Sequence, residues 1–123
     1  MDKNIKKILD KINLNDSYYK YFENASLEKL KVLTKDKKWE IYIKNTDMFP
    51  TEVLNELYER IDLLDKKVKE KTLIFNFTNK DINKYKDYFN IIINNIKKIR
   101  LKEFYLDKIF IDNDNLYLKA TNS

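Results

Sequence analysis

The sequence predicts an α+β fold. Hydrophobic residues recur at helical spacing in some segments and alternate with polar residues in others, as in amphipathic helices and half-buried strands. These segments follow one another as two helices, a β-hairpin, a helix, a strand, a helix and a second β-hairpin. Because helices and strands do not strictly alternate, we expect α+β rather than α/β. With 43% hydrophobic and 37% charged residues, the 123-residue chain has enough apolar side chains for a core.

Two short helices are predicted at the start of the chain. Helical spacing of isoleucine and leucine predicts the first over residues 3–13. Asn15 or Asp16 can cap the second, and its aromatic face comprises Tyr18, Tyr21 and Phe22. A DNA-reading helix–turn–helix is the alternative, but a helix of about two turns offers few base-reading side chains. We therefore expect a helical lid whose aromatic residues join the core.

A β-hairpin is predicted next, over residues 27–34 and 39–44, where the period changes to two. The polar segment 35–38 is the expected turn. Side chains that alternate to one face of such a hairpin are candidates for burial. They are Leu30, Val32, Trp39, Ile41 and Ile43.

The only proline indicates where the next helix begins. Proline lacks a backbone N–H and is favoured in the first helical turn, so Pro50 predicts a helix over 51–66. A strand over 72–78 should follow, with Leu73, Phe75 and Phe77 on one side. The central and C-terminal residues that we expect in the core, beyond those of the hairpin, are Phe49, Pro50, Val53, Leu57, Ile61, Phe75 and Phe89.

The last third of the chain predicts a helix and a second hairpin. Thr78 and Asp81 have capping-box spacing, and an apolar stripe from Ile82 to Ile96 follows them. The basic segment 97–102 should close this helix, because cations are favourable at a helix C-terminus. Strands over 104–111 and 116–120 would then flank a turn at 112–115.

Composition excludes many kinds of catalytic site. The chain contains no glycine, histidine or cysteine. Phosphate-binding loops, dinucleotide fingerprints and nucleophile elbows need glycine, and standard KH domains clamp nucleic acid with a glycine-containing loop. Histidine is the commonest general base and metal ligand. The Asp-Asn repeat at 112–115 lacks the glycine and glutamate of a calcium loop and reads as a turn. We therefore expect no catalytic, cofactor or metal site.

The positive charge leaves two interpretations open. The formal net charge is +5 and the isoelectric point is about 9.2, which favours an anionic partner. However, almost all the positive charge is lysine, as a coding bias or a solvated surface would also produce. If a basic interaction surface exists, we expect it to comprise Lys35, Lys37, Lys38, Tyr42, Lys97, Lys98, Arg100 and Lys102.

Three central segments point to a family. They are 27–32 (Leu-Glu-Lys-Leu-Lys-Val), 37–43 (Lys-Lys-Trp-Glu-Ile-Tyr-Ile) and 49–53 (Phe-Pro-Thr-Glu-Val). Together they resemble the extreme N-terminus of PolC-type DNA polymerase III α subunits of low-GC Gram-positive bacteria. The resemblance extends through 21–25 and, more weakly, through 104–111. It implies that residues 1–78 are similar to N-terminal domain I of the family and 79–123 to the beginning of domain II.

The resemblance carries further expectations. Domain I of the family is similar to the polymerase-binding domain of the clamp-loader tau subunit, a reduced KH-like fold. The full-length polymerase has 3′–5′ exonuclease activity and uses Mg or Mn ions, but the catalytic segments lie elsewhere. The resemblance implies a non-catalytic module that contacts replisome proteins, with tau as the candidate partner. It also implies a cytoplasmic location and no membrane partner.

Three functional hypotheses follow from these observations. The first is a protein-interaction module of a replicative polymerase, which should expose an apolar–aromatic patch at the edge of the fold. The second is a basic KH-like nucleic-acid-binding module, whose affinity should fall with salt. The third, a free-standing nuclease, has the least support because the usual general bases and metal ligands are missing.

Overall fold

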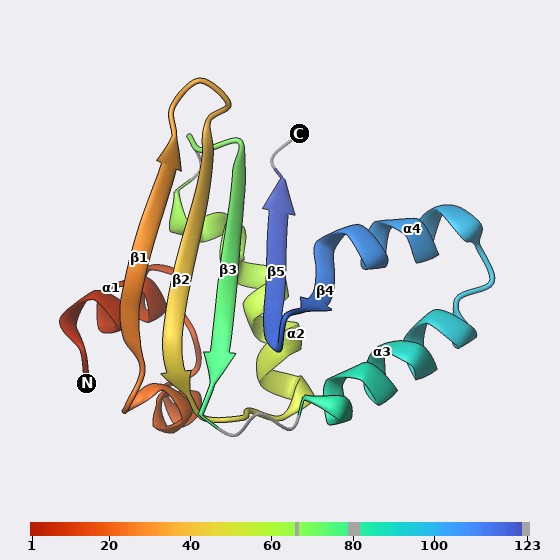
Figure 1. The fold of residues 1–123 in the computed structure, drawn as a ribbon, viewed down its shortest axis with the longest axis horizontal. Coiled ribbons are helices and arrows are strands. Elements are labelled where there is room, and N and C mark those ends of the chain that lie inside the picture. Colours follow the sequence, from red (N-terminus) through yellow and green to blue (C-terminus); the bar gives the residue numbers. More distant parts are fainter. Residues whose placement is uncertain (66, 79–81, 122–123) are drawn as a thin grey trace.

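The computed structural model describes residues 1–65, 67–78 and 82–121. It confirms the α+β class, with five strands in one mixed sheet (Figure 1). The elements in chain order are α1 (Lys3–Lys11), the 3₁₀ helix η1 (Asp16–Phe22), β1 (Ser26–Leu33), β2 (Lys38–Thr46), α2 (Thr51–Arg60), the 3₁₀ helix η2 (Ile61–Leu64), β3 (Glu70–Phe77), α3 (Asn83–Asn95), α4 (Ile99–Lys108), β4 (Ile109–Asp112) and β5 (Asn115–Thr121).

The strands lie in the order β1-β2-β3-β5-β4. β1 pairs antiparallel with β2, and β2 pairs parallel with β3. A parallel pair needs a crossover, which α2 and η2 supply. β5 pairs antiparallel with both β3 and β4. Figure 1 shows α1 and α2 behind the sheet, whereas α3 and α4 extend beyond its β4–β5 edge. Among the residues that the structure describes, no helix covers the other face of the sheet, which we call the helix-free face.

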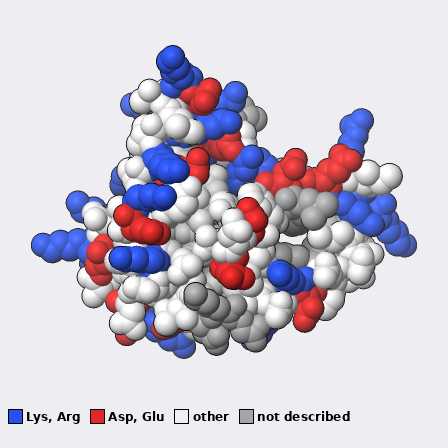
Figure 2. Space-filling view, viewed as in Figure 1, with Lys and Arg blue, Asp and Glu red and all other residues white. Residues whose placement is uncertain are grey.

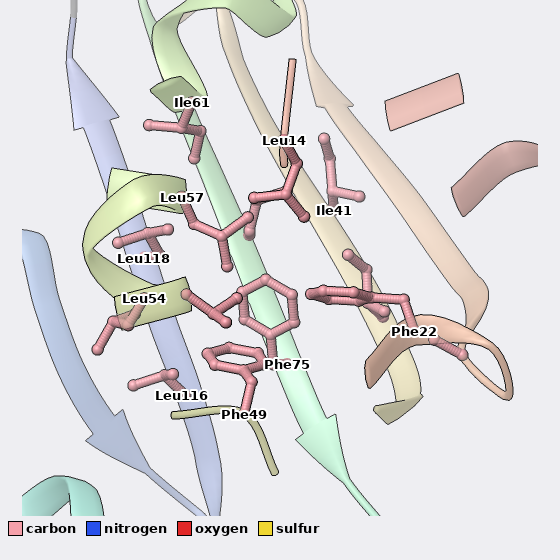
Figure 3. Packing of buried hydrophobic residues seen from close by; sticks show 14 of the residues in the cluster. Leu14, Phe22, Ile41, Phe49, Leu54, Leu57, Ile61, Phe75, Leu116 and Leu118 are labelled. Carbon is pink, nitrogen blue, oxygen red and sulfur yellow. The ribbon is translucent and has the colours of Figure 1, made fainter. Parts of the chain in front are cut away.

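The core lies between the sheet and the helices α1 and α2. Phe75 of β3 is 1% exposed and meets the rings of Phe22 and Phe49. Figure 3 shows these three rings converging, with leucines of α2 and β5 beside them. Each buried phenylalanine removes a large apolar area from water. The aromatic lid predicted for η1 thus joins the core through Phe22.

The helix starts are largely set by local sequence. The Asp2 carboxylate accepts hydrogen bonds from the backbone N–H groups of Asn4 and Ile5 and caps α1. Asn15 caps η1, as predicted, by accepting a hydrogen bond from the Ser17 N–H. Pro50 stands immediately before α2. The expected helix over 51–66 therefore begins at the predicted place and ends in the tighter turns of η2.

Turns are built without glycine. The second hairpin turns at Asn113 and Asp114, whose φ angles are 50° and 62°. Both residue types tolerate this left-handed conformation better than most, so the turn predicted at 112–115 is confirmed. In the first hairpin Lys37 takes the same conformation, with a φ of 51°. No helix within the described ranges is long and apolar enough to cross a membrane.

One expected helix is two helices. The apolar stripe predicted a single helix ending in the basic segment 97–102, but α3 ends at Asn95 and α4 begins at Ile99. Asn94 and Asn95 are poor helix formers and end α3. The basic segment therefore lies at the beginning of α4, where cations gain nothing from the helix dipole. The capping residue Asp81 lies outside the described residues.

The strand predicted over 104–111 is wrong for most of its length. Residues up to Lys108 continue α4, and β4 comprises only 109–112. The alternating hydrophobic residues here stand among arginine, leucine, lysine and glutamate, which are good helix formers. Local propensity and contacts of α4 with β4 and β5 outweigh the strand-like alternation.

Candidate functional site

An apolar groove lies between α1 and the first hairpin. Its hydrophobic lining comes from Ile8 of α1, Leu64 of η2 and four hairpin residues, and we call this set the α1 groove: Ile8, Leu27, Leu30, Trp39, Ile41 and Leu64. Leu30 lies opposite Ile41 in the β1–β2 register, and Val32 lies opposite Trp39. Directly opposite residues share a face, so all four point to the helix-covered side of the sheet.

The groove is open because α1 lies across β1 and covers only part of that strand (Figure 1). Leu30 and Val32 are 47% and 48% exposed as a result. The prediction that both are buried is wrong: their direction was inferred correctly, but no helix reaches far enough to cover them.

The rim of the groove is basic. Lys7 and Lys11 line it together with Asn4, and the two lysines are one helical turn apart on α1. Both are exposed. The groove lining contains no acidic residue among those that the structure describes. An apolar floor beside two cations favours a ligand that is both apolar and acidic.

The helix-free face of the sheet carries a second basic–aromatic cluster. The ammonium groups of Lys29 and Lys31 lie 4.4 and 5.5 Å from the ring centroid of Tyr42. The Tyr42 O–H donates a 2.8 Å hydrogen bond to Glu40, and this bond raises the pKa of Tyr42 to about 12. Figure 2 shows basic side chains along the β1–β2 side of this face.

Two other cations on this face, Lys38 and Lys119, are already paired. Glu70 accepts ion pairs from Lys38 at 3.2 Å and Lys119 at 2.8 Å. Beside them, the rings of Phe110 and Tyr117 stack with centroids 4.6 Å apart. The carboxylate reduces the positive potential that a polyanion would meet here.

The structure does not bring the predicted basic residues together. Lys35 and Lys37 lie at the tip of the first hairpin, whereas Lys97 and Lys98 lie between α3 and α4, and Arg100 and Lys102 are in α4. Figure 1 shows the hairpin tip at the end of β1 and β2, whereas the connection between α3 and α4 lies far beyond the β4 edge of the sheet. Tyr42 and Lys38 belong to the helix-free face, so the eight residues do not form one continuous surface.

The first half of the chain matches a known family. The model of the DNA polymerase III polC-type N-terminus I covers residues 4–63. Residues 4–63 are similar to the N-terminal segment of this family. The segment runs from α1 into η2 and includes every residue that lines the α1 groove except Leu64. No curated protein and no solved structure matches the chain.

The finer expectations from the resemblance remain predictions. The similarity to a KH-like domain of tau is one of them. The division at residue 78 is another, because the match to the PolC-type N-terminus I ends before it. Strands from both sides of that position pair in one sheet, β3 with β5.

Most of the residues expected in the core are buried. Trp39 and Pro50 are only partly buried, and Trp39 also lines the α1 groove. The side chain of Phe89 lies outside the described residues. Those that are buried are Ile41, Ile43, Phe49, Val53, Leu57, Ile61 and Phe75.

One buried cation has a structural explanation. Lys71 of β3 is 0% exposed and donates hydrogen bonds of 2.8 and 2.7 Å to the backbone carbonyl oxygens of Asp62 and Asp65. Burial lowers the pKa of Lys71. A lowered lysine pKa can indicate a nucleophile, but this ammonium is enclosed and bonded to the end of η2. Within the described ranges, no three acidic side chains gather to hold a metal ion.

The groove residues Lys7, Ile8 and Lys11 were missed as functional candidates. The spacing of the isoleucines and leucines around them predicted a helix, and Ile8 was assigned to the buried face of that helix. A signal was available, since α1 was predicted to be short and the following strand to carry Leu30 and Val32 on one face. The groove needs the position of α1 along β1, which local sequence does not specify.

Proposed function

We propose that this chain is a non-catalytic accessory module through which a PolC-type DNA polymerase III contacts another replication protein. The match of residues 4–63 to the PolC-type N-terminus I supports the polymerase context. In this proposal the chemistry, and any divalent metal ions, belong to other parts of the polymerase, and this chain needs no cofactor.

The observation that carries the proposal is the open α1 groove. Leu30 and Val32 are about half exposed although they point to the core side of the sheet, and Trp39 extends the same apolar surface. Leaving large apolar side chains in water is unfavourable by roughly 25 cal/mol per Å². Contiguous patches of this kind commonly mark protein-binding sites.

The proposed partners are replisome proteins, and the clamp-loader tau subunit is the first candidate. This choice rests on the resemblance of the central segments to the N-terminus of PolC-type polymerases. A membrane is not a proposed partner.

The chain's binding to purified tau and other replication proteins tests the proposal. We expect dissociation constants in the micromolar range, as is usual for small transient interfaces. Leu30→Asp should weaken binding at least tenfold by placing a charge on the groove. Leu101→Asp is the matched control, because Leu101 is also 47% exposed but lies on α4. Absence of binding to every replication protein at about 100 μM, with the chain folded, would refute the proposal.

The second candidate function is binding of single-stranded nucleic acid on the helix-free face. Lys29, Lys31 and Tyr42 supply the cations and the aromatic ring that such sites use. It ranks second because Glu70 already pairs with Lys38 and Lys119. Titration with oligothymidine at low and high salt tests it: binding should weaken with salt and with Tyr42→Ala.

A further inference from the structure

We infer that β1 and the α1 groove together bind an extended, acidic segment of the partner protein, which adds to the sheet as a strand. This inference rests on the proposed function and specifies its ligand. The added strand would pair with the outer edge of β1. Its apolar side chains would enter the groove, and its acidic side chains would meet lysines on both sides of it.

β1 has the position that strand addition requires. It is the first strand in the sheet order β1-β2-β3-β5-β4 and pairs only with β2 among the described strands. Its eight residues from Ser26 to Leu33 match the length of a typical peptide strand. An edge strand presents unpaired N–H and C=O groups, and peptide recognition by strand addition uses these groups for affinity.

The groove supplies pockets for alternate side chains of the added strand. Leu30 and Val32 are two residues apart and face the same side of the sheet. A strand placed beside β1 would direct every second side chain to that side as well, within reach of Leu30 and Val32. Burying these half-exposed side chains would remove apolar surface from water, and the shape favours leucine- or isoleucine-sized groups.

Lysines on both sides of β1 select for acidic side chains. Lys7 and Lys11 line the groove on the helix side, and Lys29 and Lys31 are exposed on the other face of β1. Glu28 is exposed at the bulge of β1. Asp10 of α1 is bonded to Lys6 and Tyr19, and Asp2 caps the helix. The charges that remain near the added strand are mainly positive.

The same lysines disfavour a second copy of this chain as the occupant. Antiparallel pairing of two β1 strands would place Lys29 and Lys31 close to the same lysines of the other chain. Like charges opposite one another are destabilising in a sheet, and lysines on edge strands are a common device against self-association. An acidic strand turns this repulsion into attraction.

Two synthetic peptides of roughly ten residues test the inference. One alternates leucine and isoleucine with aspartate and glutamate, and the other carries lysine and arginine in place of the acids. Each is titrated into the isotopically labelled chain and followed by backbone amide NMR. The acidic peptide should shift amide signals of β1 and α1 and slow hydrogen exchange in β1. The basic peptide should leave them unchanged.

Matched variants separate the groove from the charges. Leu30→Asp should reduce the affinity for the acidic peptide at least tenfold, whereas Leu101→Asp should not. The double variant Lys7→Glu/Lys11→Glu should weaken binding of the acidic peptide and permit binding of the basic one. The control double variant is Lys97→Glu/Lys98→Glu, which changes the net charge equally in the loop before α4. Equal loss in both double variants would show a general charge effect and overturn the inference.

Backbone methylation tests strand addition directly. Two forms of the acidic peptide carry N-methyl groups on alternate residues, one form on the odd and one on the even positions. Since only every second N–H of an edge-paired strand bonds to its neighbour, one form should lose binding and the other keep it. Retained binding by both forms would overturn the inference. So would a chain that binds oligothymidine on the helix-free face but shows no response to the acidic peptide.

The outcomes also distinguish this inference from the proposed function. If a replication protein binds the chain and Leu30→Asp weakens it, but the acidic peptides fail, the groove is an interface of another kind and only the strand-addition inference is lost. If no replication protein binds but the acidic peptide does, the site is correct and the assignment to replication is lost.

Discussion

The Tyr85 hydroxyl donates a hydrogen bond to the backbone carbonyl oxygen of Phe49. Tyr85 belongs to α3, and Phe49 precedes α2, so this bond joins elements that are far apart in the sequence. The Tyr85 ring is 1% exposed and stacks on Phe77 at 5.7 Å between centroids. The beginning of α3 is therefore part of the core, although the rest of the α3–α4 hairpin extends beyond the sheet (Figure 1).

Tyr85→Phe should destabilise the fold by about 1 kcal/mol, because it leaves the buried Phe49 carbonyl without this donor. The pH dependence should also change. Burial raises the pKa of Tyr85 above its usual value, so above roughly pH 10 the unfolded chain loses this proton while the folded chain keeps it. The contribution of Tyr85 to the free energy of unfolding is therefore fully present below that pH and decreases progressively as the pH rises above it.

Urea unfolding at intervals between roughly pH 8 and 11 measures this effect. The wild type should lose more stability than Tyr85→Phe over this range. The other tyrosines, and Lys71 with its opposite shift, are common to both proteins and cancel in the difference. Parallel pH curves for the two proteins would contradict the prediction.

Leu30 and Ile41 face each other across β1 and β2, but we expect very different costs for removing them. Leu30→Ser should cost about 1 kcal/mol or less, because the side chain is 47% exposed. Ile41→Ala should cost roughly 2–5 kcal/mol, since Ile41 is 3% exposed and its truncation leaves a cavity. Chemical denaturation measures both, and similar costs would show that the α1 groove is closed in solution.

Lys71→Met should destabilise the fold by roughly 1–3 kcal/mol at neutral pH. Methionine fills a similar volume but leaves the carbonyl oxygens of Asp62 and Asp65 without the Lys71 donors. Lys119→Met is the comparison, because that ion pair with Glu70 is partly exposed and should contribute about 1 kcal/mol or less. Thermal and urea unfolding provide the measurement. A Lys71 variant that is as stable as the wild type would show that desolvation of the ammonium offsets its hydrogen bonds.

Thr46→Val should stabilise the fold by roughly 1 kcal/mol. Thr46 is 0% exposed, and its hydroxyl has no hydrogen-bond partner among the described residues. A buried hydroxyl without a partner is unfavourable, and valine has almost the same shape. Thr72→Val, on the partly exposed side of β3, is the control and should change stability by less than about 0.5 kcal/mol. A destabilised Thr46→Val protein would indicate that the hydroxyl is satisfied by water.

Local patterns in the sequence were sufficient for much of this fold and for its family. The first helix, the Asn15 cap, the hairpin over β1 and β2, the Pro50 helix start and the final Asp-Asn turn all depend on residues close together in the chain. Short-range spacing and capping decide such elements. The central segments around Trp39 and Pro50 also led to the PolC-type family, which the match over 4–63 confirms.

Tertiary packing decided the rest. The pattern of β1 correctly directed Leu30 toward the core side, but whether it is covered depends on where α1 lies along the strand. Segment 97–102 carries cations that suit the end of a helix, yet the break at Asn95 places them at the start of α4. The candidate site exists because α1 leaves Leu30 and Val32 of β1 partly uncovered. Exposure is set by contacts between elements that are distant in the chain, whereas the spacing of residues in the sequence reports only on neighbours.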